Sequence, residues 1–357
     1  MISFPPEAVD LLVGWYQQNR RDLPWRESRD PYRVLVSEIM LQQTRAETVK
    51  PYFHRFLEAL PTVEALATCD EATLLKLWEG LGYYSRARNL QKAARAVMER
   101  HGGLIPADFD ALLALPGVGR YTAGAVASIA YGIPVPAVDG NVLRVLARLL
   151  GDDTDVLSAA AKTRAEQALA PHVPNEGAGD FTQSLIELGA LICTPGEHPK
   201  CDDCPLRLLC VAEREGRQGE LPVRLSKTMR RVEKRTVLVI RQRGSDGRVA
   251  LRRRPTEGLL GGLYEFPCLP EWVGEADLRA HLAALGLTVE RIAPLGEARH
   301  LFSHVEWKMQ GYLVTVAPVG AGDAVSDWVW ASYTELEEIY PLPSAYAAYR
   351  GACFDGD

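Results

Sequence analysis

The sequence predicts a multidomain protein in which an all-helical domain precedes a smaller α+β domain, and three observations support this. A chain of 357 residues is long enough for two domains of moderate size. Up to about residue 212, apolar residues recur at spacings of three and four, the period of amphipathic helices. From about residue 234 the pattern changes to alternating, β-branched and aromatic runs, which are typical of strands. We place the helical domain at 1–212, a basic linker at 213–232 and the second domain at 233–350.

Seven helical segments are predicted in the first domain from this spacing. In chain order they cover residues 9–18, 31–43, 48–60, 72–81, 86–102, 109–132 and 181–192. Glycine and proline punctuate them, because both end or interrupt helices; they stand at Pro51, Pro61, Gly102–Gly103, Pro116 and Pro134. In the second domain we expect one helix and a set of strands: the helix at 275–286, and strands at 234–243, 247–254, 304–318 and 327–333.

The composition excludes disordered, membrane and secreted proteins. With 47% hydrophobic and 24% charged residues, the chain has the balance of an ordinary globular protein. No stretch approaches the ~20 apolar residues of a membrane span. The first ten residues, MISFPPEAVD, have neither the basic n-region nor the apolar h-region of a secretory signal. We therefore expect a cytoplasmic protein whose seven cysteines are reduced.

The charge of the chain is unevenly distributed. The net charge is −6, but residues 224–254 hold twelve Lys or Arg against Glu233 and Asp246, which gives this segment +10. Such a segment is either a solvated connector or a set of phosphate contacts on a nucleic acid. The pattern of charge leaves both interpretations open.

A cysteine-rich loop is the strongest chemical motif. Four cysteines stand within eighteen residues, separated by gaps of seven, two and five; they are Cys193, Cys201, Cys204 and Cys210. Four thiolates at this density can surround one metal centre, and the spacing alone does not distinguish zinc from an iron–sulfur cluster. The alternative is a group of buried free cysteines. The isolated Cys69, Cys268 and Cys353 are expected to be inert.

The segment 111–126, ALLALPGVGRYTAGAV, predicts two helices joined by a glycine turn. Gly117 and Gly119 allow a tight turn whose free N–H groups point outward at the start of the second helix, which is a site for a phosphate. A GxG between helices is otherwise a plain turn. The preceding Pro116 and the small residues that follow favour a helix-hairpin-helix that binds the DNA backbone.

Two carboxylates are candidates for acid–base chemistry. Glu38 lies in VLVSEIMLQQT on a helix face that is otherwise apolar, where burial would raise its pKa as a general acid requires. The alternative is a glutamate at the edge of that face, reaching solvent. Asp139, in PAVDGNVLRVLAR, is either the N-cap of the next helix or a second carboxylate that stabilises a developing cation, as in glycoside cleavage.

Aromatic and basic residues alternate in GLGYYSRARNL (80–90). Tyr83 and Tyr84 are suited to wedge or stack between bases, while Arg86 and Arg88 are suited to hold phosphates. Tyrosines of a protein core at the entry to a helix are the alternative.

Together these segments resemble the endonuclease III superfamily of helix-hairpin-helix DNA glycosylases and, within it, the MutY family of adenine DNA glycosylases. The resemblance covers nearly the whole chain in the order of the family. The motifs that carry it are LPWR (23–26), SEIMLQQT (37–44), GLGYYSRARNL (80–90), LPGVGRYTAGAV (115–126), VDGNVLRVLAR (138–148), the cysteine loop (193–210), GLLGGLYEFP (258–267) and RHLFSHVEW (299–307).

The resemblance implies a base excision repair enzyme that removes adenine mispaired with 8-oxoguanine or guanine in double-stranded DNA. It implies a helical glycosylase domain with one 4Fe–4S cluster on the four cysteines, and a C-terminal Nudix-like domain that recognises 8-oxoguanine. We expect a monomer that associates with the nucleoid through DNA binding.

The resemblance also assigns residues. Glu38 would protonate N7 of the flipped adenine, and Asp139 would stabilise the oxocarbenium-like sugar or trap it, oriented by Tyr121 and Asn141. The adenine pocket would include Trp25, Arg26 and Gln183. Residues at the DNA would be Gln43, Thr44, Tyr83, Arg86, Gly117 and Gly119. Phe302, Ser303 and His304 would inspect 8-oxoguanine.

Departures from the family pattern bear on these expectations. The first cysteine gap is seven residues instead of the usual six, and one extra residue can bulge out of the loop without moving a ligand. Tyr121 and Leu143 stand where lyase-active relatives and some MutY proteins carry lysine. Neither position supplies the usual amine for Schiff-base chemistry, so we expect no strong lyase activity.

Three rival interpretations fit the sequence less well. Tyr121 and the long C-terminal part argue against a pyrimidine glycosylase and lyase like endonuclease III. The helix at 275–286 lacks the glutamate-rich REXXEE core that a Nudix hydrolase needs for Mg²⁺. Glu38, Asp139 and Tyr121 argue against a DNA-binding protein without catalytic activity.

Overall fold

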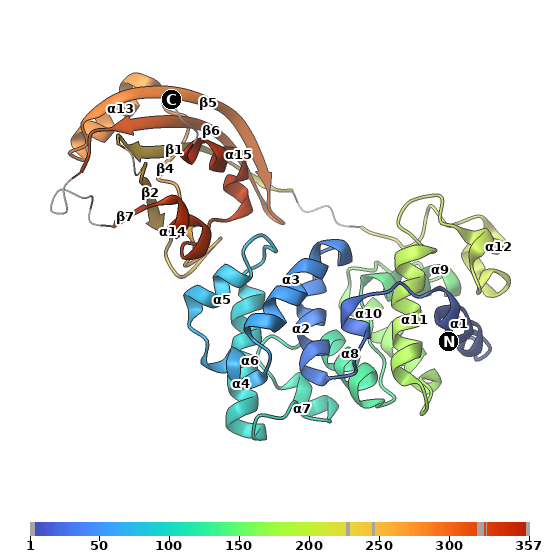
Figure 1. Cartoon of the computed structure of the whole chain (residues 1–357). Coiled ribbons are helices and arrows are strands. Elements are labelled where there is room, and N and C mark those ends of the chain that lie inside the picture. Colours follow the sequence, from blue (N-terminus) through green and yellow to red (C-terminus); the bar gives the residue numbers. More distant parts are fainter. Residues whose placement is uncertain (1–3, 226–228, 245–246, 320–324, 326, 355–357) are drawn as a thin grey trace. The chain divides into compact units, whose positions relative to one another are not determined.

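The computed structural model describes residues 4–225, 229–244, 247–319, 325 and 327–354, and divides into two compact units (Figure 1). We call the first, Met1–Cys69 with Arg88–Lys227, the helical unit. The second, Asp70–Ala87 with Thr228–Asp357, is the sheet unit. Among the described helices, none has the length and hydropathy that crossing a membrane requires.

In the described part of the helical unit, every regular element is a helix. Its α-helices are α1 (Ala8–Asn19), α2 (Pro31–Leu41), α3 (Ala46–Ala59), α4 (Val63–Thr68), most of α6 (Ser85–His101), α7 (Phe109–Leu113), α8 (Arg120–Tyr131), α9 (Gly140–Leu150), α10 (Ala159–Leu169), α11 (Ala178–Leu191) and α12 (Val211–Glu215). Single 3-10 turns lie at η1 (Pro24–Arg26), η2 (Ala170–His172), η3 (Cys201–Asp203) and η4 (Arg207–Leu209).

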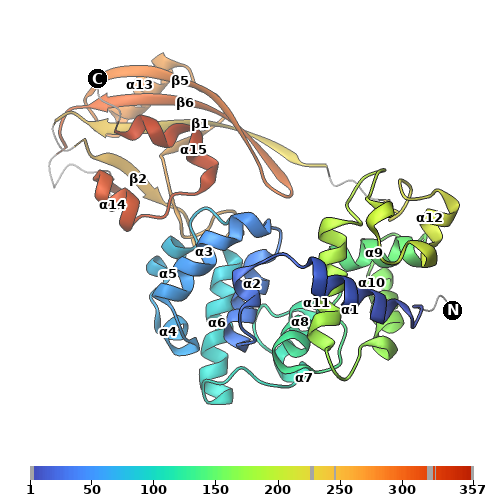
Figure 2. The ribbon, with the colours of Figure 1, turned by 45° about the vertical axis from the view of Figure 1, so that its right-hand side comes forward.

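The central helices pack through buried apolar faces. α8 contacts α2 and α11, and α11 in turn contacts α1 and α9 (Figure 2). The apolar positions of α11 that the spacing predicted lie in one buried cluster with those of α9. To this cluster α9 contributes Val142, Val145, Leu146 and Leu149, and α11 contributes Phe181, Leu185 and Leu188. The all-helical architecture predicted for this part of the chain is confirmed.

Two proline sites had different outcomes. α7 ends before Pro116 and α8 begins at Arg120, so the predicted break of the 109–132 segment into two helices is confirmed. Pro51 was predicted to interrupt the helices, but α3 continues through it. The proline removes one backbone hydrogen bond, while the buried Val49, Phe53 and Phe56 hold the helix in place.

The sheet unit is built on one mixed sheet. Its strands are β1 (Arg231–Gln242), β2 (Val249–Arg253), β3 (Tyr264–Glu265), β4 (Cys268–Pro270), β5 (Val289–Leu301), β6 (Val305–Val316) and β7 (Trp328–Ala331). The strand order is β3-β2-β1-β6-β5, with β4 pairing with β1 and β7 with β2. β1 and β6 run parallel from the pair Arg231↔Val305 onward, and the other pairs are antiparallel.

Helices cover both faces of this sheet (Figure 1). Alternate side chains of β1 point to opposite faces. Leu238 and Ile240 pack with Leu278 and Leu282 of α13 (Glu275–Ala284). Val237 and Val239 belong to the other core, with side chains of α14 (Tyr333–Glu338), η5 (Ser344–Tyr346), α15 (Ala347–Arg350) and η6 (Gly351–Cys353). The predicted α+β class of the C-terminal part is confirmed.

The structure groups the segment Asp70–Ala87 differently from the sequence-based division, which placed it within a 1–212 domain. This segment contains α5 (Glu71–Leu77) and the first turn of α6, and it belongs to the sheet unit. Its side chains bond to the C-terminal helices; Lys76, for example, donates to the carbonyl of Leu336. Contacts between residues 260 positions apart leave no periodic pattern in the sequence.

Two further features of the sheet unit differ from expectation. β5 was not predicted, because Pro294, Gly296 and two register shifts interrupt its alternation and none of its described residues is fully buried. The basic segment 224–254 is not a linker over most of its length, since β1 begins at Arg231 and β2 covers 249–253. Several of its arginines are used inside the fold: Arg248 pairs with Glu335, while Arg252 and Arg254 pair with Glu265.

Candidate active site

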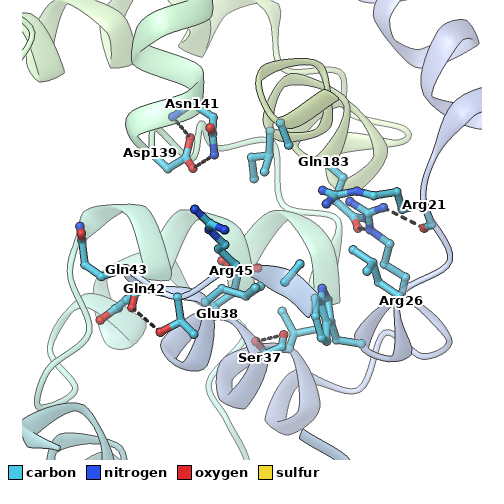
Figure 3. Close-up of a pocket in the computed structure, with 18 of the residues that line it drawn as sticks. Arg21, Arg26, Ser37, Glu38, Gln42, Gln43, Arg45, Asp139, Asn141 and Gln183 are labelled. Carbon is cyan, nitrogen blue, oxygen red and sulfur yellow. Dashed lines mark hydrogen bonds between the residues drawn. The ribbon is translucent and has the colours of Figure 1, made fainter. Parts of the chain in front are cut away.

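A cavity of about 840 Å³ in the helical unit brings most of the predicted site residues together (Figure 3). It lies among η1, α2, α8, α11 and the N-terminus of α9. Nine residues predicted from the sequence line it: Trp25, Arg26, Glu38, Gln43, Thr44, Tyr121, Asp139, Asn141 and Gln183. These residues come from positions as far apart as 25 and 183, so only the folded chain assembles them.

Glu38 is held at this cavity by a buried helix. Asp30 caps α2 by accepting a hydrogen bond from Arg33 N, and Pro31 occupies the first helical position. The glutamate is only 6% exposed, so its burial, predicted from the apolar face, is confirmed. Burial raises the pKa of Glu38 to about 7; the hydrogen bond from Tyr121 lowers it, and the nearby charge of Asp139 raises it further.

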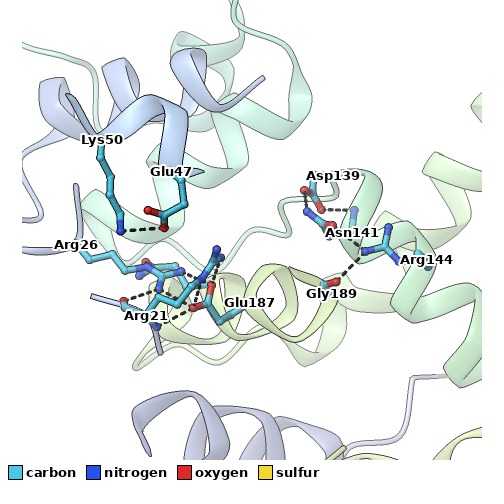
Figure 4. Close-up of polar contacts among 10 residues, drawn as sticks. Arg21, Arg26, Glu47, Lys50, Asp139, Asn141, Arg144, Glu187 and Gly189 are labelled. Carbon is cyan, nitrogen blue, oxygen red and sulfur yellow. Dashed lines mark hydrogen bonds and ion pairs between the residues drawn. The ribbon is translucent and has the colours of Figure 1, made fainter. Parts of the chain in front are cut away.

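Asp139 is the N-cap of α9 and also lines the cavity, so the two interpretations of this residue do not exclude each other. Its Oδ1 accepts hydrogen bonds from the backbone N–H groups of Asn141 and Val142, both at 2.8 Å. Its Oδ2 accepts from Asn141 Nδ2 at 2.7 Å. Burial raises the pKa of Asp139, and these hydrogen bonds oppose the rise. Arg144 fixes the Asn141 amide by donating to its Oδ1 at 2.9 Å (Figure 4).

Tyr121 has a different partner from the one expected. It was predicted to orient Asp139, but its hydroxyl donates to Glu38 Oε2 at 2.6 Å. The side chain comes from the first turn of α8, which packs against α2 and therefore reaches Glu38. Asn141, in contrast, does hold Asp139, as predicted.

A buried carboxylate that the sequence did not single out organises the wall of the cavity. Glu187 of α11 is fully buried and pairs with Arg21 and Arg26 (Figure 4). Although burial alone would raise its pKa, hydrogen bonds from Arg21 and then Arg26 lower the pKa of Glu187 to about 2. Arg26 Nε also donates to Gln183 Oε1 at 3.1 Å. Two predicted pocket residues are thus joined through this ion-pair network.

Trp25, Gln43 and Thr44 complete the cavity wall. Trp25 is buried and meets the ring of Phe53 edge-on at 5.7 Å. Gln43 follows α2 in the left-handed region, with φ of +58°. This tight turn redirects the chain between α2 and α3, so that Gln43 and Thr44 stand at the cavity. The cavity also takes in Arg21 and Arg45, which were not predicted.

The glycine turn between α7 and α8 has the conformation that a helix-hairpin-helix needs. Gly117 has φ of +75°, and a Cβ there would lie 2.5 Å from Cβ of Asn89, so only glycine fits. Gly119 is the N-cap residue of α8. Because no side chain caps α8, its first N–H groups face outward at the positive end of the helix dipole.

Tyr83 and Arg86 lie in the sheet unit, and Arg86 does not have the exposed position that a phosphate contact requires. Tyr83 is 48% exposed, whereas Arg86 is only 8% exposed. The Arg86 guanidinium donates to the carbonyls of Leu81 and Gly82 and stacks over the ring of Trp78. Burial lowers the pKa of Arg86 to about 10, so it stays charged while it supports the loop that carries Tyr83.

Phe302, Ser303 and His304 form the turn between β5 and β6, the position before a strand that the sequence predicted. The turn is closed by a hydrogen bond from Phe302 N to Val305 O at 2.8 Å. The ring of Phe302 packs edge-on against Trp307 at 4.8 Å and anchors the turn on the core. Ser303 and His304 are exposed at its tip.

The four cysteines of the loop surround one small cavity of about 30 Å³ next to α9. Burial raises the pKa of Cys201 to about 11 and of Cys204 to about 12, and a positive centre bound at these two thiols would favour their ionised forms. Arg148 Nη1 contacts Cys193 Sγ at 3.5 Å. Within the part of the chain that the structure describes, no group of three or more His, Cys, Asp or Glu side chains is drawn together to hold a metal ion.

Comparisons with known protein families agree with this architecture. Residues 36–171 match the family model described as HhH-GPD superfamily base excision DNA repair protein, and residues 236–350 match that of a NUDIX domain. Among solved structures, the chain is similar to a thermostable thymine-DNA glycosylase, with a TM-score of 0.54 and 34% identity over 58% of this chain and 96% of that one. It is also similar to endonuclease III in a trapped covalent complex with DNA, with a TM-score of 0.50 and 28% identity over 59% and 98% of the two chains.

Curated relatives extend the similarity over nearly the whole chain. The adenine DNA glycosylase of Rattus norvegicus is 37% identical over 409 residues, covering 96% of this chain and 78% of the relative. The adenine DNA glycosylase of Schizosaccharomyces pombe is 31% identical over 413 residues, covering 96% and 88%.

Proposed function

The chain belongs to the adenine DNA glycosylases, base excision repair enzymes that act on N-glycosyl bonds, and from that premise we propose that it removes adenine paired with 8-oxoguanine or guanine from duplex DNA. The observation that carries this proposal is a pair of carboxylates, Glu38 and Asp139, on one cavity. Glu38 accepts a hydrogen bond from one tyrosine hydroxyl, whereas Asp139 accepts three from Asn141 and Val142. This difference suits Glu38 to donate a proton and Asp139 to carry a negative charge.

The target base must leave the duplex to reach these carboxylates. A cavity of about 840 Å³ is large enough for an extruded adenine and its sugar. Trp25 supplies an aromatic surface, while Arg26 and Gln183, joined by a hydrogen bond, supply polar atoms for the edge of the base. The buried Glu187 holds Arg26 in place.

The proposed reaction breaks the bond between the sugar C1′ and adenine N9. Glu38 donates its proton to N7, so the electron pair of the breaking bond passes to the protonated base, which leaves as neutral adenine. Asp139 carries the negative charge that stabilises the oxocarbenium-like sugar, or bonds to C1′ until water replaces it. Asn141 and the N-terminus of α9 hold Asp139, and the Tyr121 hydroxyl holds Glu38.

We expect the excision rate to fall as the pH rises above about 7. The general acid must be protonated, and burial raises the pKa of Glu38 to about 7, so each further pH unit removes about nine-tenths of the active form. Asp139 must be ionised, so its protonation sets the decline at low pH. Single-turnover rates on an 8-oxoguanine:A duplex across this range provide the test. A rate that stays level well above pH 7 would contradict the assignment of Glu38 as the acid.

The proposed enzyme releases the base without cleaving the strand. A lyase needs an amine that attacks C1′. Tyr121 occupies one of the two positions where the family resemblance places a lysine in lyase-active relatives or in some MutY proteins, and the buried Leu143 occupies the other. The product is therefore an intact abasic strand.

We propose that the turn at Phe302-Ser303-His304 reads 8-oxoguanine. Ser303 and His304 offer a hydroxyl and an imidazole for the polar edges of the base, and Phe302 anchors the turn. Replacing both polar residues by alanine should reduce the preference for 8-oxoguanine:A over G:A by about 1–3 kcal/mol, the energy of one good base contact. The ratio of single-turnover rates on the two duplexes measures it. Equal slowing on both would indicate a folding or docking defect instead.

We propose that Cys193, Cys201, Cys204 and Cys210 hold one 4Fe–4S cluster. The four cysteines line one cavity, and four thiolates are the ligand set of such a cluster; the family resemblance favours it over a zinc ion. The purified protein should be brown, with broad absorbance near about 400 nm and iron as its metal. Anaerobically purified protein containing one zinc and no iron would overturn this assignment. The chemistry proposed above needs no electron transfer, so the cluster would serve to shape the loop.

Chromatography of the products tests the proposed function as a whole. Incubation with an 8-oxoguanine:A duplex should release free adenine and leave a strand of full length. Release of a pyrimidine from damaged duplexes, with no release of adenine, would contradict it.

A further inference from the structure

Glu79 joins the Tyr83 segment to the C-terminal helices within the sheet unit. Its Oε1 accepts hydrogen bonds from Leu342 N at 2.9 Å and from Arg350 Nη1 at 3.1 Å. Its Oε2 accepts from Lys76 Nζ at 2.5 Å, and the same Nζ donates to the carbonyl of Leu336 at 3.0 Å. One carboxylate therefore ties together two stretches of chain more than 250 residues apart.

These contacts are shielded from solvent. The side chains of Lys76 and Glu79 are 16% and 14% exposed, and that of Arg350 is 31% exposed. An isolated ion pair on the surface contributes little, but a half-buried carboxylate that accepts three donors forms a network with a defined geometry. Removing Glu79 would leave the Leu342 N–H and two cations without this partner.

The loop that follows Glu79 is held by its own hydrogen bonds. Trp78 Nε1 donates to Gly82 O at 3.1 Å, and Gly80 N donates to Tyr84 Oη at 3.2 Å. Arg86 Nη2 donates to the same Gly82 carbonyl at 3.1 Å. Tyr83 itself has φ of +47°, a left-handed conformation that persists only where the surroundings enforce it. Because these hydrogen bonds hold the loop together, a change in the position of Glu79 would also move Tyr83.

The far end of this loop meets the turn between β5 and β6. The hydroxyls of Tyr83 and Ser303 lie 2.9 Å apart in a hydrogen bond. The loop is therefore attached to the C-terminal part of the sheet unit at two points, at Glu79 and at Tyr83.

We propose that Glu79 is a positioning residue for lesion discrimination. It holds the Tyr83 loop against the turn that carries Ser303, so that the aromatic wedge and the lesion-reading turn engage the damaged base pair as one rigid piece. The inference rests on the proposed function, and it adds a residue that touches neither the base nor the reacting atoms.

The test compares excision from 8-oxoguanine:A and G:A duplexes by the wild type, Glu79→Ala, Glu79→Gln and Glu337→Gln. Loss of the carboxylate in Glu79→Ala should reduce the ratio of the two single-turnover rates about tenfold, while the rate on G:A stays close to that of the wild type. Glu79→Gln keeps an acceptor for Leu342 N and should recover part of the ratio. Glu337 also pairs with Arg350, but from α14, so Glu337→Gln is the matched control and should keep the full ratio.

A second measurement follows the wedge directly. A duplex with 2-aminopurine beside 8-oxoguanine becomes fluorescent when the stack is opened, and Glu79→Ala should weaken this response at saturating protein. Arg350→Met, which removes the donor and keeps the aliphatic length, should have the same effect and replaces the alanine variant if that variant does not fold.

The outcomes separate the two proposals. If the wild type prefers 8-oxoguanine:A and Glu79→Ala keeps that preference, the positioning role of Glu79 is overturned while the proposed lesion recognition stands. The same conclusion follows if Glu79→Ala slows excision equally on both duplexes. A wild-type protein without any preference would overturn the proposed lesion recognition and this inference with it.

Discussion

Replacing Glu38 by glutamine is expected to remove nearly all adenine excision while DNA binding is retained. The change keeps the size of the side chain and an acceptor for the Tyr121 hydroxyl, but removes the proton that the leaving base needs. The loss of a general acid corresponds to a fall in rate on the order of 10²–10⁴-fold. Single-turnover kinetics on an 8-oxoguanine:A duplex measure the rate, and a gel-shift titration measures the binding.

A measurement of thermal stability distinguishes the loss of the general acid from a loss of folding. Burial of the Glu38 carboxyl disfavours its ionised form, so a neutral amide should leave the thermal unfolding midpoint unchanged or raise it. Ser37→Ala is the matched control within the same cavity, because Ser37 lies beside Glu38 in α2, also lines the cavity, and donates to the local Val34 carbonyl without a carboxyl proton to give. A Glu38→Gln rate close to that of the wild type would remove the residue from the mechanism.

Replacing Asp139 by asparagine should slow excision on the order of 10²–10³-fold through the loss of a charge at the sugar. Asparagine is as good an N-cap as aspartate, so the start of α9 keeps its hydrogen bonds to Asn141 N and Val142 N. The new amide would, however, face the Asn141 amide, which Arg144 prevents from turning over. A small loss of stability therefore accompanies the large loss of rate.

The comparison with Asp139→Ala isolates the cap. Alanine removes the charge and the cap together, and losing the cap costs about 1 kcal/mol of stability. Both variants should be equally slow, but only the alanine variant should unfold at a clearly lower temperature. If asparagine restored the rate while alanine did not, Asp139 would act as a cap and not as a charge.

The sequence predicted best those features that a local pattern of residue types determines by itself. Glu38 on an apolar helix face predicted a buried carboxyl, and the structure gives it a raised pKa. The apolar period at 181–192 predicted α11 because burial of one face determines the spacing along a helix. Local rules also found the break at Pro116 and the turn at Ser303.

The remaining features depend on contacts between distant residues, which no local pattern records. Glu187 binds arginines more than 160 positions away and has no neighbour that marks it as part of a site. The pattern GLGYYSRARNL predicted Arg86 as an exposed basic residue. Its side chain is buried instead, because it donates hydrogen bonds to the carbonyls of its own loop. The Asp70–Ala87 segment has an ordinary helical period, which says nothing of its attachment to the C-terminal helices.

The choice of opposing base tests the central claim most directly. Duplexes carrying adenine opposite 8-oxoguanine, G, C or T are incubated with the protein, and strand breaks are scored before and after alkali. We expect breaks only after alkali, fastest opposite 8-oxoguanine, then opposite G, and hardly at all opposite C or T. Breaks without alkali, with most of the protein trapped on DNA by borohydride, or equal rates opposite all four bases, would contradict the account.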